Sequence, residues 1–215
     1  MRTKTLLLAA VLSAAGVASS LAQVYSVNAV GYVNVTLTGG LNLICNPLKV
    51  TAGNDLSHVL PLTDADIGTT VYTYDTAFHN STWLGSTLGW SPNLTVAPGQ
   101  GFFISIAAGT TKTVTFVGEV PQGADSNISI RNGLSLISSP VPQSLVLSAM
   151  GFPADAGDTV YFYRGTPKAY VNSVFLGATL GWTPPANAAP AVGEGFWASK
   201  AAAATWTRNF SVNTP

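Results

Sequence analysis

The chain contains several of its own segments twice, and this duplication constrains the fold more than any other feature of the sequence. Residues 84–92 read LGSTLGWSP, and residues 176–184 read LGATLGWTP. Three further blocks recur in the same order; they begin at Asn34, Val71 and Gly99 and again at Asn127, Val160 and Gly193. We therefore expect two tandem, or pseudo-symmetric, units of about 90 residues each.

The repeated blocks have the patterning of strands. Val33, Val35 and Leu37 alternate with other residues at the period of two that marks a half-buried strand. The blocks at Val71 and Val160 combine β-branched and aromatic residues, which favour strands. Prolines recur too often for long helices. The sequence predicts an all-β fold whose units are sandwich-like or jelly-roll-like.

A glycine-containing pair follows the first predicted strand of each unit. The pair is Gly39-Gly40 in one copy and Asn132-Gly133 in the other, and both pairs suit the tight turn of a hairpin. Pro47 and Pro140 follow the next strand and are expected to end it, because proline has no N–H to donate to a sheet.

Two further recurring elements are interpreted as structural and not as ligand-binding. Trp90 and Trp182 lie in a repeated Gly-Trp-x-Pro turn, which favours a structural plug over a ligand site. Gly101 and Gly195 each lead into a strand that begins with phenylalanine. Turn residues at these positions are expected to feed the strand.

The first 22 residues have the pattern of an export signal. Arg2 and Lys4 precede an apolar run over residues 6–17, and small residues at 20 and 22 predict cleavage before Gln23. The run is shorter than the roughly 20 residues that span a bilayer. We therefore expect a secreted protein, in the extracellular space, at the cell surface or in the periplasm, with no membrane span after cleavage.

The expected organisation after the leader has three parts. Residues 23–33 are predicted to form an N-terminal strap strand, residues 34–120 the first unit and residues 121–215 the second unit. Residues 24–34 read VYSVNAVGYVN. This opening, the Leu-x-x-x-x-Asn-Pro strand and the Gly-x-Gly-Phe-(Phe/Trp) element resemble a set of secreted β-rich proteins of verrucomicrobial and planctomycete-type bacteria. The resemblance covers nearly all of the mature chain and implies export, but it carries no known activity to transfer.

Charge and cysteine content exclude several functional classes. Charged residues make up only 8% of the chain, and without Arg2 and Lys4 the balance is slightly acidic. A chain without basic clusters cannot neutralise many phosphates, so nucleic acid is not an expected partner. Cys45 is the only cysteine, so no intramolecular disulfide forms, and its apolar neighbours predict a buried thiol.

No catalytic set stands out. The acidic residues before the Val-Tyr strands are typical of turns; they are Asp64, Asp66, Asp155 and Asp158. Glu119 and Glu194 are the only glutamates, and Gln100 replaces Glu194 in the first unit. We predict no catalytic residue, no cofactor and no metal site, although turn oxygens keep calcium open as an alternative.

The two histidines do not complete a catalytic or metal-binding set either. A Ser-His-Asp triad would need His58 or His79, and neither recurs in the second unit. Two histidines and one distant cysteine make a poor zinc site. Structural or surface roles are therefore expected for both histidines.

The aromatic residues are the remaining functional signal. Trp83, Trp197 and Trp206 are not tryptophan in both units, so with Tyr170 they are the candidates for ligand binding. Core packing is the competing interpretation, because aromatic side chains dominate core energetics. Exposed rings would indicate sugar stacking, whereas burial would indicate a scaffold.

The expected function follows from export, duplication and low charge. We predict a non-catalytic structural or adhesive module of the cell surface or extracellular matrix. A carbohydrate-binding module is the alternative, and a hydrolase-associated domain ranks third. The expected partners are further copies of the chain, other envelope or matrix proteins, or polysaccharide.

Overall fold

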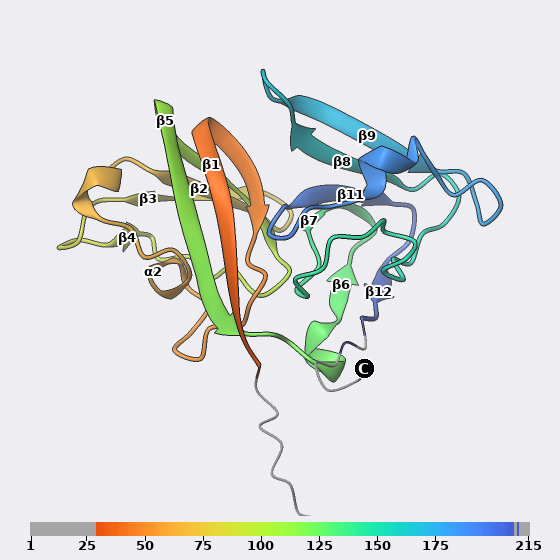
Figure 1. The fold of residues 1–215 in the computed structure, drawn as a ribbon, viewed down its shortest axis with the longest axis horizontal. Coiled ribbons are helices and arrows are strands. Elements are labelled where there is room, and N and C mark those ends of the chain that lie inside the picture. The colour runs from red at the N-terminus through yellow and green to blue at the C-terminus, as the bar shows by residue number, and fades with distance from the viewer. Residues whose placement is uncertain (1–28, 209, 211–215) are drawn as a thin grey trace, which may run out of the picture.

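A computed structural model describes residues 29–208 and residue 210. Over these residues the chain is nearly all β, which confirms the predicted fold class. Two antiparallel five-stranded sheets form the body of the molecule (Figure 1). The predicted leader and the first part of the strap lie outside the described residues. Residues 30–33 of the strap are the beginning of the first long strand.

The first sheet has the strand order β1-β5-β2-β3-β4. Its strands are β1 (Val30–Cys45), β2 (Thr70–Tyr74), β3 (Phe78–Trp83), β4 (Trp90–Ser91) and β5 (Gly101–Glu119). β1 and β5 pair along almost their whole length, and the orange and green ribbons bend over together in Figure 1. Val33 from one half of β1 and Ile44 from the other half share one hydrophobic core, so the bent ribbon encloses that core.

The second sheet has the order β10-β9-β8-β11-β7, and a two-stranded sheet pairs β12 with β6. The strands are β6 (Ile128–Ile130), β7 (Gly133–Ile137), β8 (Thr159–Arg164), β9 (Ala169–Phe175), β10 (Trp182–Thr183), β11 (Phe196–Lys200) and β12 (Ala204–Trp206). The short helices in the described residues are α2 (Leu56–Val59) and three 3₁₀ turns at Asp64–Asp66, Gly123–Ser126 and Pro185–Ala188.

The sequence duplication is visible as a repeated strand order. Read from one edge, β1-β5-β2-β3-β4 corresponds strand for strand to β7-β11-β8-β9-β10. In the second unit, the β6–β12 pair takes the place of the outer half of the β1–β5 ribbon. Each unit is therefore sandwich-like, with a bent ribbon over a sheet.

The predicted hairpins at Gly39-Gly40 and Asn132-Gly133 are wrong. β1 continues through the first pair with a register shift between Thr38 and Gly40. In the second unit, β6 and β7 pair with β12 and β11 and not with each other. Gly40 and Gly133 have φ of 84° and 81°. The recurring glycine therefore serves a bulge or bend, which needs the same backbone freedom as a turn.

Each unit has its own core, and the repeated tryptophans are buried in these cores. Trp90 is 5% exposed in the first core and Trp182 is 4% exposed in the second. β1 ends at Cys45 and β7 at Ile137, just before the two recurring prolines.

A third core joins the two sheets. Leu43 and Phe103 of the first unit pack with Leu136 and Trp197, which are their sequence equivalents in the second unit. Four tyrosines of β2 and β8 pack around this cluster. Because equivalent residues meet across the contact, the two units face each other as the subunits of a twofold dimer do.

The backbone contacts around the third core also come in equivalent pairs. Cys45 N donates to Gly193 O at 2.9 Å, and its equivalent Ser138 N donates to Gly99 O at 2.8 Å. The β-bridge between Ile44 and Glu194 likewise has its counterpart between Ile137 and Gln100.

Gly101 and Gly195 allow this close approach. A Cβ atom on Gly101 would lie 3.0 Å from Ile137 N, and one on Gly195 would lie 2.5 Å from Ile44 O. Both contacts reach the backbone of the opposite unit, which cannot move aside cheaply. The close contact between the units therefore requires glycine at both positions.

Candidate functional site

An aromatic groove of about 640 Å³ opens between the two sheets. Five of its lining residues come from the first unit and two, Tyr163 and Tyr170, come from the second. The lining residues are Leu41, Tyr72, Phe78, Phe103, Ser105, Tyr163 and Tyr170. A ligand in the groove would therefore touch both units.

Side chains alternate between the two faces of a strand, and this alternation places tyrosines of β2 and β8 on the face that lines the groove. Val71 and Thr73 are buried on one face of β2, so Tyr72 and Tyr74 project from the other. The equivalent alternation on β8 projects Tyr163. Alternate residues of the Val-Tyr-x-Tyr block thus pack in the core on one face of the strand and point toward the groove on the other face.

Cross-strand pairs build the two walls of the groove. Phe78 of β3 is opposite Tyr74, and Tyr170 of β9 is opposite Tyr163; in both pairs the ring centroids are 5.2 Å apart. Phe78 is 57% exposed and Tyr170 is 54% exposed. These two rings therefore offer the most surface to a ligand.

Trp197 supports the groove from inside the third core. Its ring centroid lies 4.9 Å from that of Tyr74, 6.0 Å from that of Phe78 and 6.4 Å from that of Phe103. Edge-to-face and tilted contacts at these distances are favourable. They hold the groove rings in fixed positions before any ligand arrives.

The groove also carries free polar groups. Among the described residues, no hydrogen bond engages the hydroxyl of Tyr72, Tyr163 or Tyr170. Ser105 adds a further hydroxyl to the lining. Phenol hydroxyls both donate and accept, so the groove combines flat apolar faces with unused hydrogen-bonding capacity.

A second hollow of about 490 Å³ continues from the groove and shares Leu41 and Tyr163 with it. Lys168, in the β8–β9 loop, donates from Nζ to Leu41 O at 2.9 Å and also to Asn42 Oδ1. Partial burial lowers the pKa of the Lys168 ammonium. The loop of the second unit is thereby fastened to β1 of the first.

The four residues that the sequence offered as ligand-binding candidates differ in exposure in the structure. Tyr170 lies in the groove as an exposed ring. Trp83, Trp197 and Trp206 are only 7%, 8% and 0% exposed, so they have no open ring face for a ligand. Nε1 of Trp83 donates to Thr63 O, and Nε1 of Trp206 donates to Met150 O, both at 2.8 Å. Of the two interpretations that the sequence left open for these tryptophans, burial favours core and interface packing over ligand binding.

Sequence reasoning did not single out the other groove residues. Leu41 and Phe103 belong to recurring blocks and Phe78 does not, but no pattern indicated that the three meet in a groove, because their meeting point depends on how the units pack. The Val-Tyr-x-Tyr alternation carried the usable signal, since a strand with one buried face must show its tyrosines on the other. The contact between the units decided that those tyrosines line a groove.

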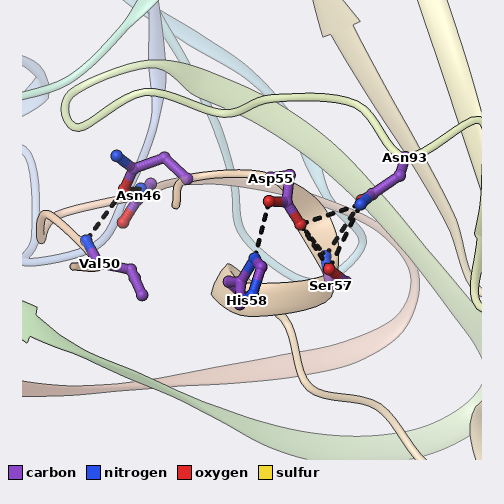
Figure 2. A network of polar contacts seen from close by, with 7 residues as sticks. Asn46, Val50, Asp55, Ser57, His58 and Asn93 are labelled. Atoms are coloured by element: carbon purple, nitrogen blue, oxygen red, sulfur yellow. Dashed lines mark hydrogen bonds and ion pairs between the residues drawn. The ribbon is translucent and has the colours of Figure 1, made fainter. Parts of the chain in front are cut away.

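A polar network surrounds the start of α2 (Figure 2). Asp55 caps the helix and contacts Ser57 Oγ at 2.5 Å, His58 Nδ1 at 2.7 Å and Asn93 Nδ2 at 3.0 Å. These hydrogen bonds, chiefly those from Ser57, lower the pKa of Asp55. Asp55 stands between serine and histidine, whereas a triad needs the histidine in the middle. The arrangement fits helix capping.

The other histidine lies at the exposed start of β3, next to the turn that contains Asp75. His79 Nε2 is 3.1 Å from Asp75 Oδ1. Hydrogen bonds from the backbone N–H groups of Thr76 and Ala77, with a smaller contribution from His79, lower the pKa of Asp75 to about 2.

The remaining acidic candidates are engaged within the protein. Asp64 accepts from the backbone N–H of Ser86 at 2.6 Å. Asp66 pairs with Lys112 at 2.7 Å, and Glu194 pairs with Arg164 at 2.5 Å. Within the described residues, no group of three or more His, Cys, Asp or Glu side chains is placed to hold a metal ion.

The same part of the chain contains no helix that is long and apolar enough to cross a membrane. The sequence and the fold matched no protein-family model, no curated protein and no solved structure.

Proposed function

We propose that this protein is a secreted, non-catalytic adhesive module that binds polysaccharide in the aromatic groove between its two units. The observation that carries the proposal is the groove lining: exposed rings of Phe78 and Tyr170 on opposite walls. Sugar rings present apolar C–H faces edged by hydroxyl groups. Flat rings and unused phenol hydroxyls complement both features.

The charge of the groove favours a neutral glycan over an anionic ligand. None of its seven lining residues is charged, and the nearby Lys168 ammonium is already bound to Leu41 and Asn42. An anionic ligand would need free cations or an array of N–H donors. A neutral polysaccharide chain needs neither.

Sedimentation with a panel of insoluble polysaccharides tests the proposal. The mature protein is expected to sediment with at least one of them, and Tyr170→Ala and Phe78→Ala are each expected to weaken that binding about tenfold, or ~1.4 kcal/mol. Tyr32→Ala is the matched control, because Tyr32 is 73% exposed on β1 outside the groove. Equal binding by all three variants would rule out the groove as the site.

Self-assembly is the second candidate function. Val30 and Tyr32 are 70% and 73% exposed on β1, an edge strand of its sheet, and Val117 is opposite Tyr32. An exposed edge with apolar side chains is a template for pairing with another chain. Concentration-dependent assembly without glycan, lost in Tyr32→Lys, would favour this candidate.

A further inference from the structure

The second unit contains an ion pair that is closed off from solvent. Lys200 ends β11, and Asp158 directly precedes β8, next to the Ser199–Thr159 pair of the ladder. The two side chains are 0% and 1% exposed, and Lys200 Nζ contacts Asp158 Oδ2. Desolvation offsets most of the attraction in such a pair, so it stabilises little more than apolar residues of similar volume would.

The first unit shows that the fold does not require these charges. Thr69 and Ile106 occupy the positions equivalent to Asp158 and Lys200, and they are 6% and 7% exposed. The same strand ends are therefore packed there without an ion pair. The buried lysine and aspartate are a special feature of the second unit.

The groups around the pair suit a reaction between them. Asp158 Oδ2 accepts from Asp155 N at 2.8 Å, and Asp158 Oδ1 accepts from Ala201 N at 3.3 Å. These two N–H groups can stabilise negative charge that develops on the carboxyl oxygens. Asp155 Oδ2 lies 3.4 Å from Lys200 Nζ, and the Asp155 side chain is 71% exposed. A second carboxylate, that of Asp155, thus reaches the amine from the solvent side.

We propose that Lys200 and Asp158 condense into an intramolecular amide bond. Proton transfer within the pair gives an amine and a carboxylic acid, and a buried site penalises this neutral pair less than two charges. The Nζ lone pair attacks Cγ of Asp158, forming the Nζ–Cγ bond. Asp155 takes one proton from Nζ and returns it to the departing hydroxyl group. The Cγ–OH bond breaks and one water leaves, so no oxidant or other reactant is needed.

The bond would link the start of β8 to the end of β11 in a chain whose single cysteine excludes an intramolecular disulfide. A covalent link between distant positions restricts the unfolded chain as a disulfide does. The second unit, in which the long ribbon is broken into two short strand pairs, would gain a mechanical clamp.

Peptide mapping of the folded full chain by mass spectrometry tests the proposal. Trypsin cleaves after Arg131, Arg164, Lys168, Lys200 and Arg208 in the unmodified chain. The amide predicts residues 132–164 joined to residues 169–208, with the sum of the two masses reduced by one water and no cleavage at Lys200. Recovery of residues 132–164 and 169–200 as separate peptides of full mass would overturn it.

Three variants assign the roles of the residues. Lys200→Met keeps the buried volume and is expected to abolish the joined peptide. Asp155→Asn changes an exposed side chain and is expected to slow formation of the bond at least about a hundredfold. Full cross-linking in Asp155→Asn would overturn its role as the proton carrier. Lys112→Met, which removes the partly exposed ion pair with Asp66 in the first unit, is the control and keeps the cross-link.

Discussion

At the scale of single residues, burial separates the aromatic side chains that build this protein from those that are available to a ligand. All five tryptophans are at most 8% exposed, whereas Phe78 and Tyr170 are more than half exposed. Tryptophan is the usual first candidate for sugar stacking, but its large apolar surface also makes it the most valuable core residue. In the described part of this chain, the aromatic rings that are more than half exposed belong to Phe78, Tyr32 and Tyr170.

Trp206 is expected to be one of the most destabilising positions to truncate. Its side chain is fully buried, and its ring packs against Phe152 and Phe196. Trp206→Ala should lower the free energy of unfolding by about 3–5 kcal/mol because it leaves a large cavity. Denaturation in urea measures this, with Tyr32→Ala as an exposed aromatic control that changes stability by less than about 0.5 kcal/mol. Equal effects of the two variants would contradict the assigned burial.

The Cys45 thiol is expected to be inert in the folded protein. Burial raises its pKa from 9.0 to about 12, and only the thiolate reacts with disulfide reagents. Because the pKa is raised, folding also loses stability as pH rises above 9.0 toward 12. A colorimetric thiol assay at neutral pH should detect no free thiol until denaturant is added. Rapid labelling of native protein would place Cys45 at the surface.

At the scale of elements, the sequence predicted the strands better than their pairing. The alternation at Val33, Val35 and Leu37 and the Val-Tyr-x-Tyr blocks do form strands. The hairpins failed because a glycine with positive φ serves a bulge as well as a turn, and local sequence does not distinguish the two. The groove was not predictable for a related reason: Phe78 and Tyr170 come together only when the units pack.

The recurring glycines should be intolerant of side chains because of the contact between the units. Gly195→Val would place Cβ 2.5 Å from Ile44 O, and we expect a loss of about 1–3 kcal/mol in unfolding free energy. Gly101→Val should behave similarly. Ala169→Val, at an exposed position that begins β9, adds the same methyl groups without a backbone contact and should be nearly neutral. Chemical denaturation compares the three, and a neutral Gly195→Val would contradict the close contact.

At the scale of the whole molecule, the third core joins the two repeats into one body. Equivalent residues meet across it, so each unit covers apolar surface that the other would leave exposed. The duplication itself was readable in the sequence, but the face through which the copies join was not. The same contact that buries Leu43 and Leu136 leaves the aromatic groove open along one side.

The molecule is expected to lose stability in acid. The hydrogen bonds at Asp55 and Asp75 lower both pKa values below 3.8. Carboxylates of this kind stabilise the fold above their ordinary pKa, and that contribution is lost as pH falls through the lowered values. The melting temperature should therefore fall between about pH 4 and about pH 2. Asp55→Asn should reduce this dependence in a thermal melt, and an unchanged acid profile would contradict the assigned role of the α2 network.

The most direct test of the account is whether one ligand uses both walls of the groove. The measurement, made by calorimetry, is the affinity of the intact protein for a soluble oligosaccharide of the polysaccharide with which we expect it to sediment. Phe78→Ala on β3 and Tyr170→Ala on β9 should each lower affinity about tenfold. Tyr32→Ala should leave it unchanged. Loss of binding on mutation of only one wall, or of neither, would contradict a groove shared between the two units.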